Sequence, residues 1–203
     1  MTFIAPIVEG HGEVLSVKAL LHRIATDAAP GALLRVNAPI RVKSGSFLAG
    51  GPYADNYVRM AAAKAREHAD GHVLLMLDSE DDCPGTLGPR LLERCRQASA
   101  GVNVVVALAF REYETWFVAA AESLRGVQGL SAGVTAPANP EGSRDAKGWL
   151  RQHMPHGYDP ISDQLPFTQR FELAAARRVD SFDRLYRKVQ ALLLTPPAEG
   201  AVS

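Results

Sequence analysis

The sequence has very little cysteine and no excess of charge of either sign. Its 203 residues include two cysteines, Cys83 and Cys95, and 22 basic residues that balance 22 acidic ones. Two cysteines make no disulfide framework and their spacing matches no zinc motif, so we expect one loop thiol and one core thiol in a reduced, cytoplasmic protein. The neutral balance argues against a free-standing, non-specific polyanion binder, which normally carries a clear basic excess.

Long apolar runs and several common catalytic motifs are also missing. No stretch is long enough to span a bilayer, and the N-terminus has neither the basic nor the apolar part of a signal peptide, so we expect no membrane association. There is no Walker P-loop and no G-x-S-x-G, and Cys83 has no obvious histidine partner. Apolar residues nevertheless make up 47% of the chain, enough for a sizeable core.

Apolar stretches that predict strands alternate with amphipathic stretches that predict helices along the first 110 residues. Strands are expected at 2–8, 33–43 (interrupted at Pro39), 72–78 and 102–110. Helices are expected at 13–28, 57–69 and 89–98, with a glycine-rich loop at 44–56 and a polar loop at 79–88. This alternation predicts an α/β, Rossmann-like fold with a mostly parallel central sheet flanked by helices.

The last third of the chain is predicted to be a helical C-terminal extension. The stretch 126–148 is rich in Gly, Ser, Ala and Pro, and we interpret it as a long loop or lid rather than a packed element. Helices are expected from about Asp145, at 166–177, and from Ser181, the last with Ser181 or Asp180 as its cap. The expected division is an α/β core at 1–125, a lid and helices that pack on it at 126–194, and a flexible tail at 195–203.

Acidic residues follow three of the predicted strands, at the point where each strand ends. They are Glu9 and Glu13, then Asp78 and Glu80, then Glu112 and Glu114. In an open parallel sheet the carboxyl ends of the strands meet at one edge, so we expect these carboxylates to gather. Crowded carboxylates raise one another's pKa unless a cation compensates, and hard ions such as Mg²⁺ take oxygen ligands. The pattern therefore predicts a metal site with Asp78 and Glu80 as ligands and Glu9 as ligand or general base.

Each acidic group also has a simpler interpretation when it is taken alone. Glu13 can stabilise a helix N-terminus, residues 79–82 can form a solvated loop, and Glu112 and Glu114 can lie at the surface. The coincidence of three acidic strand ends favours the metal site over these alternatives.

The glycine-rich turn Gly10-His11-Gly12 begins like a dinucleotide fingerprint, but Leu15 stands where the third glycine belongs. We expect its glycines to let the backbone turn tightly and the substrate approach. His11 could act as a catalytic acid or a phosphate ligand, although a loop histidine without a partner is more often incidental. A nucleotide bound here without metal is disfavoured because the flanking glutamates would repel its phosphates.

Several short motifs resemble known families. The stretches "IVEGHGE" and "VLLMLDSED" resemble the Toprim signature, and the E-G-x-x-E form is similar to that of overcoming-lysogenization-defect (OLD) nucleases. The order "VEGHGE … LDSEDDC … REYETWFVA … KGWL … SFDRL" resembles a family of small prokaryotic proteins, domain of unknown function 4276, over about residues 3–190.

The resemblance implies a Toprim-like fold and a Mg²⁺ or Mn²⁺ site. The ion would be held by Asp78 and Glu80, with Glu9 as ligand or general acid/base and Glu13 as a further ligand. Glu80 stands where the signature usually has a second aspartate.

The acidic E-x-W segment of the resembled family maps to Glu114 as a metal ligand, with Glu112 as a second possibility. Trp116 in the same segment is interpreted as core packing. The basic residue that OLD-type nucleases place near the scissile phosphate has two candidates, Lys147 and Arg178.

Together these observations predict metal-dependent phosphodiester hydrolysis on nucleic acid, with DNA as the expected substrate and an ATPase as the expected partner. The alternative is a non-catalytic, Toprim-like subunit that binds metal or nucleotide and docks on a partner. The neutral charge favours dependence on a partner. A basic stripe on the last helices could contact phosphate or a partner, although such stripes are usually solvated helix faces: Arg170, Arg177, Arg178, Arg184, Arg187 and Lys188.

Overall fold

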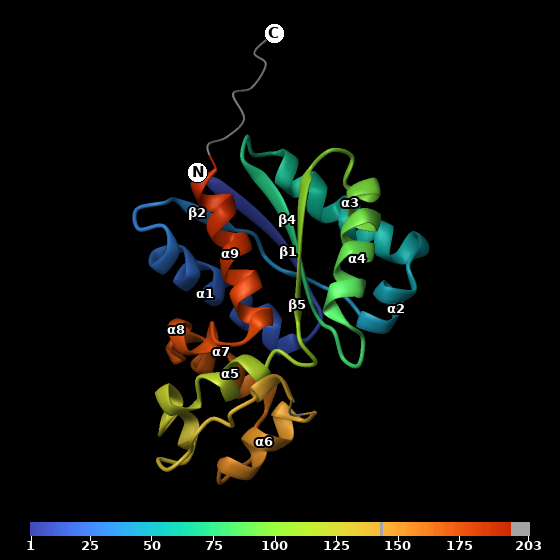
Figure 1. Ribbon diagram of the computed structural model, residues 1–203. Helices are drawn as coiled ribbons and strands as arrows, with labels where there is room; N and C mark the ends of the chain where they lie inside the picture. The colour runs from blue at the N-terminus through green and yellow to red at the C-terminus, as the bar shows by residue number, and fades with distance from the viewer. Residues whose placement is uncertain (143, 196–203) are drawn as a thin grey trace.

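Within residues 1–142 and 144–195, which the computed structural model describes, the chain is built around a five-stranded sheet whose strand pairs are all parallel (Figure 1). The strands are β1 (Thr2–Val8), β2 (Leu34–Val36), β3 (Ile40–Arg41), β4 (Gly71–Asp78) and β5 (Asn103–Ala109). Their order is β2-β1-β4-β5, with β3 pairing with β1 as well. The predicted parallel α/β sheet and the interruption at Pro39 are confirmed.

Helices cover both faces of this sheet. Helices α1 (His11–Ala28) and α9 (Asp180–Leu194) lie on one face, and α3 (Gly51–Arg66) and α4 (Pro84–Ser99) lie on the other (Figure 1). Alternate strand residues feed the two cores, because successive side chains of a strand point to opposite faces. Ile4 and Leu74, for example, pack toward α1 and α9, while Ala5 and Val73 pack toward α3 and α4.

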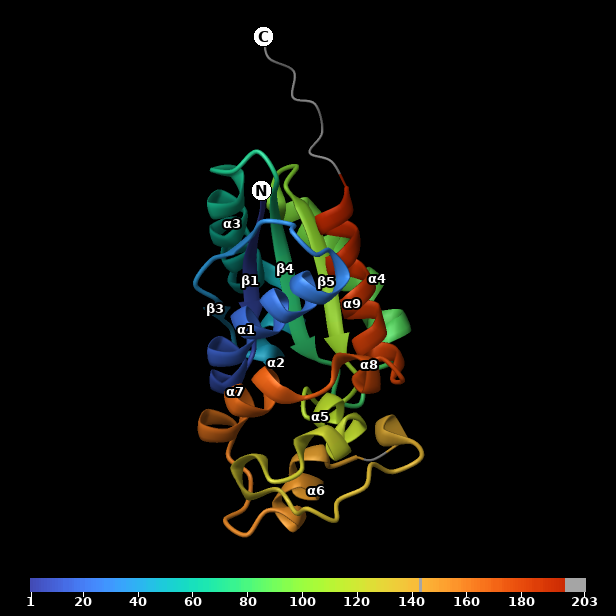
Figure 2. The same cartoon turned by 90° about the vertical axis from the view of Figure 1, so that its left-hand side faces the viewer.

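The remaining helices gather beyond the carboxyl end of the sheet. Figure 2 shows the arrowheads of β4 and β5 pointing toward this layer. It contains α5 (Thr115–Ala119), α6 (Ala146–His153), α7 (Pro160–Arg170), α8 (Leu173–Ala176) and three 3₁₀ turns, η1 (Ala121–Leu124), η2 (Val127–Gly129) and η3 (Pro140–Gly142). Helix α7 packs alongside α1. No helix in the described ranges has the length and apolar character needed to cross a membrane.

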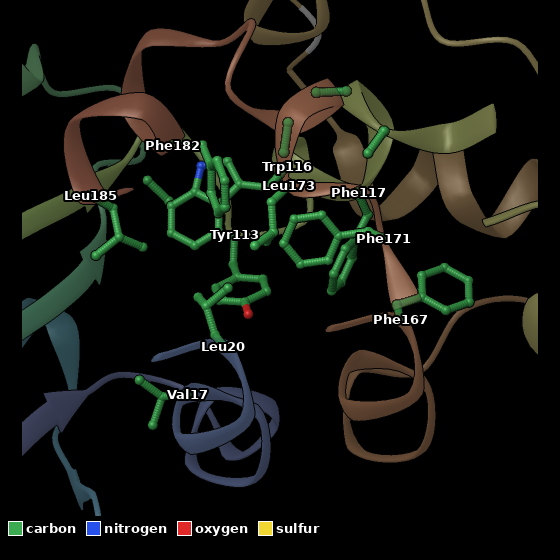
Figure 3. Close-up of a cluster of buried hydrophobic side chains, with 14 of the residues drawn as sticks. Val17, Leu20, Tyr113, Trp116, Phe117, Phe167, Phe171, Leu173, Phe182 and Leu185 are labelled. Carbon is green, nitrogen blue, oxygen red and sulfur yellow. The ribbon is translucent and has the colours of Figure 1, made fainter. Parts of the chain in front are cut away.

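A cluster of aromatic side chains joins this layer to the sheet (Figure 3). Trp116, Phe117, Phe167, Phe171 and Phe182 are fully buried. Their rings meet edge to face, with centroids 5.2 Å apart for Trp116 and Phe182 and 5.3 Å apart for Phe117 and Phe167. Such pairs add stabilisation beyond the apolar area they bury. The interpretation of Trp116 as core packing is confirmed.

The predicted glycine-rich loop at 44–56 is wrong, because this stretch contains α2 (Ser44–Ala49) and the start of α3. Burial of Phe47 fixes α2 against the sheet in spite of its glycine. Pro52 is compatible with the first turn of α3, where the missing N–H has no helical partner. Helix α4 likewise begins at a proline, Pro84, rather than at residue 89, so the polar loop after β4 is shorter than predicted.

The predicted helix at 166–177 is two helices, since α7 begins earlier, at Pro160, and a break after Arg170 separates it from α8. The Asp159 side chain caps α7 by accepting a hydrogen bond from the Ile161 N–H at 3.0 Å. The helix expected near Asp145 is confirmed as α6, and Asp145 Oδ1 accepts from the Gly148 N–H at 2.7 Å.

The interpretation of 126–148 as an unpacked lid is wrong, because Leu130, Val134 and Pro140 are buried there and the first two belong to the main core. Neither Asp180 nor Ser181 caps α9, since the residue before the helix is Val179.

The boundary at 125/126 stays a prediction. The tail expected from residue 195 lies, beyond Thr195, outside the described residues.

Candidate active site

The connections of β1 and β4 lead in opposite directions across the sheet. Helix α1 carries the chain from β1 to its neighbour β2, whereas α4 carries it from β4 to β5 on the other side. In open α/β sheets, ligands bind in the crevice that such a switch point leaves at the carboxyl ends of the strands. Glu9 follows β1 and Asp78 ends β4, so the topology places these two residues at the crevice.

A pocket of about 330 Å³ lies at this position. All five predicted metal ligands line it: Glu9, Glu13, Asp78, Glu80 and Glu114. The lining also includes Gly10, His11 and Gly12 from the first motif, and Lys147, Asp159, Pro160 and Ile161 from the C-terminal third. The structure therefore brings the predicted site residues together, while their roles stay predictions.

Asp78 is a buried carboxylate that the fold holds from one side. Asp78 is only 7% exposed, and its Oδ1 accepts a hydrogen bond from the Tyr113 N–H at 2.9 Å. Burial, followed by the charges of Glu114 and Glu13, raises the pKa of Asp78 well above its ordinary value, with Lys147 opposing the shift. Keeping such a buried acid charged costs free energy, and a bound cation would reduce that cost.

Lys147 lies among three carboxylates. Its Nζ is 3.2 Å from Glu114 Oε2, 3.5 Å from Glu112 Oε1 and 3.9 Å from Asp78 Oδ2. Glu112 also accepts a hydrogen bond from the Lys147 backbone N–H at 3.0 Å, which fixes the first turn of α6. Burial by itself lowers the pKa of Lys147, but the charges of Glu114, Asp78 and Glu112 outweigh it and raise that pKa above the usual range. The acidic neighbours therefore favour the charged form of Lys147.

Glu114 is the most deeply buried acid of the pocket, at 1% exposed. Its Oε1 accepts a hydrogen bond from the Tyr158 hydroxyl at 3.1 Å, and its Oε2 faces Lys147. Burial raises the pKa of Glu114 against the opposing charge of Lys147. Burial also raises the pKa of Tyr158, as does the charge of Glu114, so the phenol remains a donor.

The glycines of the first motif provide room rather than unusual backbone conformation. Gly10 has an ordinary φ of −90°, and Gly12 is helical. A Cβ at Gly10 would overlap the Glu13 carboxylate. A Cβ at Gly12 would overlap the Gln164 amide and lie 2.7 Å from the Pro160 carbonyl oxygen. The glycines therefore make room for Glu13 and α7, and they also line the pocket, so the expected approach of a substrate there stays a prediction.

Glu9 and Glu80 follow the neighbouring strands β1 and β4 and both line the pocket. Glu9 is half-buried, and its Oε2 has no hydrogen-bond partner in the described part of the chain. Burial raises the pKa of Glu9, opposed by the Ser44 hydroxyl. Glu80 is exposed and has a left-handed φ of +50°, and its N–H donates to the Arg111 carbonyl at 3.2 Å. Strained backbone of this kind persists where the surrounding structure imposes it.

The donor chemistry of the pocket fits a hard divalent ion, because it offers carboxylate oxygens and leaves Glu9 Oε2 without a partner. As folded, however, no three His, Cys, Asp or Glu side chains of residues 1–142 and 144–195 are arranged to hold one ion. Lys147 lies beside Asp78 instead. A bound ion would require carboxylates of the pocket to lie closer together than they do in this structure.

The two candidates for the basic residue differ in position. Lys147 lines the pocket. Arg178 is not part of the lining, and its charge helps to lower the pKa of Glu122 instead. Tyr158 and Asp159 were missed by the sequence reasoning. The Asp-Pro pair at 159–160 is a helix-start signal that could have indicated this element.

The predicted basic stripe is largely occupied by contacts within the chain. Arg177 and Arg187 each lie 2.8 Å from Asp183, and Arg184 lies 3.8 Å from Asp180. The Lys188 ammonium donates to the Val106 carbonyl at 2.6 Å, at the open edge of β5. These contacts are those expected of a solvated helix face.

Fold and pocket together define an α/β protein with an acidic, lysine-containing pocket at the switch point of a parallel sheet. The family model described as "Domain of unknown function (DUF4276)" matches residues 8–190, and the chain belongs to this family. No curated protein and no solved structure matches the chain.

Proposed function

We propose that this protein is a metal-dependent phosphodiesterase that hydrolyses nucleic acid, with DNA as its expected substrate. The observation that carries the proposal is the convergence of carboxylates from three strand ends on one pocket that also contains Lys147. A concentration of buried acids with raised pKa values is typical of functional sites. The resemblance to Toprim domains and OLD-type nucleases favours the same chemistry.

In this proposal Asp78, Glu80 and Glu13 hold Mg²⁺ or Mn²⁺, and Glu9 serves as the general base. A bound ion supplies charge stabilisation to the phosphate and to the attacking and leaving oxygens. Glu114 Oε1 accepts from the Tyr158 hydroxyl, whereas its Oε2 has no hydrogen-bond partner within the described residues and lies 3.2 Å from Lys147 Nζ. We therefore assign Glu114 to positioning Lys147 and keep it as a further metal ligand.

The chain's own residues divide the remaining work. The Lys147 ammonium faces the phosphate and offsets its negative charge, as a point charge suited to phosphate. Glu9 takes the proton of the attacking water as general base, which a raised pKa favours. The water oxygen bonds to phosphorus, the bond from phosphorus to the leaving sugar oxygen breaks, and that oxygen takes a proton from solvent.

The test is cleavage of supercoiled and single-stranded DNA with Mg²⁺ or Mn²⁺ by wild type, Asp78→Asn and Glu9→Gln. We expect metal-dependent cleavage that both substitutions abolish. The matched control is Asp81→Asn, since Asp81 lies in the same loop but is highly exposed and outside the pocket lining. Cleavage that persists in Asp78→Asn would contradict the proposal.

Isothermal titration with Mn²⁺ separates the proposal from its alternative. Metal binding without cleavage would favour a regulatory subunit that requires a partner, for which an ATPase is the expected candidate. Absence of both binding and cleavage would exclude a metal-dependent activity of the isolated chain.

A further inference from the structure

Two exposed cations lie beside the Glu9 end of the acidic pocket. Arg41 pairs with Val8 in the sheet, and the Val42 N–H donates to the Val8 carbonyl at 2.8 Å, so the chain passes directly alongside the end of β1. Arg41 and Lys43 are exposed. Neither takes part in the ion pairs formed within the described ranges. Their charge is therefore available to an anionic partner.

Two tyrosines of α3 lie next to these cations. The Lys43 N–H donates to the Tyr53 hydroxyl at 3.1 Å, and the rings of Tyr53 and Tyr57 have centroids 4.9 Å apart at 64°. A hydrogen bond with Tyr53 raises the pKa of Tyr57, and Arg41 is close enough to oppose that shift. Both rings are partly exposed.

The same helix face continues with an exposed apolar side chain. Residues at i, i+4 and i+7 share one face of a helix, which aligns Tyr53, Tyr57 and Met60. Met60 is 56% exposed although it is large and apolar. The cations of α3 itself are engaged, since Arg59 pairs with Asp55 at 3.7 Å, Lys64 pairs with Glu67 at 3.1 Å, and Arg66 donates to the Ser99 carbonyl at 3.1 Å. The free charge thus concentrates at the end of the helix nearest the pocket.

A polyanion that reaches the acidic pocket must be held by cations close to it, because the pocket's carboxylates repel phosphate. Aromatic rings beside cations are the features that bind single strands: unpaired bases stack on the rings and phosphates contact the charges. A duplex keeps its base faces stacked inside the helix and cannot use them.

We propose that Arg41, Lys43, Tyr53 and Tyr57 form a binding surface for single-stranded nucleic acid that leads the strand to the acidic pocket. The delivery of the strand for hydrolysis rests on the proposed function, whereas binding to the surface does not. Bases stack on Tyr57 and Tyr53, and the neighbouring phosphates meet Lys43 and Arg41.

The test is fluorescence anisotropy of fluorescein-labelled dT15 in EDTA, so that neither metal nor cleavage contributes. Tyr57→Ala should weaken binding about fivefold or more, while Tyr57→Phe, which keeps the ring, should bind as wild type. Arg41→Gln/Lys43→Gln should weaken binding and reduce the slope of log affinity against log salt by about 1–2. The charge-matched control is Arg184→Gln/Arg187→Gln on the opposite face of the sheet, which should bind as wild type.

Any of three results would overturn the proposed single-strand binding surface: no binding of dT15, equal effects of Tyr57→Ala and Tyr57→Phe, or equal affinity for a 15-base-pair duplex. The outcome is separate from that of the proposed function. Tyr57-dependent binding in a protein that cleaves no DNA would support the binding surface and contradict the proposed phosphodiesterase function. Cleavage that Asp78→Asn abolishes, without Tyr57-dependent binding, would overturn the surface alone.

Discussion

The aromatic cluster and the acidic pocket are neighbours that share one short segment, residues 112–119, yet their energetics are opposite. In the cluster, Trp116 and Phe117 are fully buried in edge-to-face contacts, and the Trp116 Nε1–H donates to the Ser181 hydroxyl at 2.9 Å. In the pocket, the buried carboxylates of Asp78 and Glu114 have raised pKa values.

The comparison separates residues that stabilise the fold, in the aromatic cluster, from residues that the fold positions at a cost in stability, in the acidic pocket. Well-packed apolar side chains in the place of Asp78, Glu114 and Lys147 together would serve stability at least as well as this buried charge cluster does. Local features that oppose stability without a structural gain are expected at functional sites. Four changes test this contrast, from the largest expected effect to the smallest.

Trp116→Ala should destabilise the protein by about 3–5 kcal/mol, because it removes a large buried side chain and leaves a cavity among the other rings. Urea denaturation followed by circular dichroism measures the loss. Ile161→Ala on the pocket rim is the control: Ile161 is 59% exposed, and its truncation should change stability by less than about 0.5 kcal/mol. Similar losses in the two variants would remove the distinction between cluster and pocket.

Gly12→Ala should cost about 1–3 kcal/mol, since the added methyl group must displace Gln164 or separate α1 from α7 at Pro160. Gly45→Ala is the control, because a Cβ at that helical position meets no atom within 4 Å. It should leave stability unchanged or raise it by up to about 1 kcal/mol. Thermal melts of both variants would decide, and a neutral Gly12→Ala would contradict close packing at the motif.

Lys147→Met should destabilise the protein at pH 7 by about 1–3 kcal/mol, less than for a fully buried pair because the ammonium keeps some solvent contact. The loss arises from Asp78, Glu112 and Glu114, which then lack their cation. It should shrink as the pH falls, because protonation of Asp78 and Glu114 removes the repulsion.

Melting temperatures of Lys147→Met at pH 5 and pH 8, each relative to wild type, measure this recovery. Lys64→Met removes an exposed, paired lysine on α3 and serves as the control, with little effect at either pH. A pH-independent loss in Lys147→Met would show that packing, not charge, explains it.

Asp78→Asn should give the smallest change, a gain in stability near neutral pH. The folded-state pKa of Asp78 is raised above its unfolded value, so its unfavourable contribution is absent below the unfolded pKa. That contribution grows as the pH rises through the folded pKa and is complete above it. Asparagine keeps an acceptor for the Tyr113 N–H and has no charge to bury.

The melting temperatures of wild type and Asp78→Asn in EDTA should therefore converge in acid and separate near pH 7. Added Mn²⁺ should raise the wild-type value and leave the variant unchanged, because binding to the folded state stabilises it. Asp81→Asn, in the same loop, should behave as wild type. A loss of stability in Asp78→Asn at pH 7 would contradict the claim that the charged Asp78 carboxylate destabilises the folded state.

Much of the sheet could be predicted because its signal is local. The strands at β1, β4 and β5 are continuous apolar runs, and Glu9 and Asp78 could be placed at their ends from the sequence alone. The start of α7 carries a local signal too, the Asp-Pro pair at 159–160. The whole of α2 could not be predicted. Glycine content favours a loop at α2, and only the burial of Phe47 against the sheet overrides it.

Lys147 was one of two candidates that the sequence left open, because nothing local distinguishes it from Arg178. Its position depends on α6, which Asp145 caps and Glu112 holds from 35 residues away.

The sequence by itself determined which residues form strands, which helix faces are apolar, and where along the chain the carboxylates occur. These properties follow from periodicities of two and about 3.6 residues, which neighbouring side chains set. The tertiary structure alone decided that six acids and one lysine share a pocket, that three of the acids are buried, and that the glycines of the first motif accommodate Glu13 and α7. Distances between segments and the exclusion of water arise only when helices and sheet pack, and those two quantities set the charge state of the site.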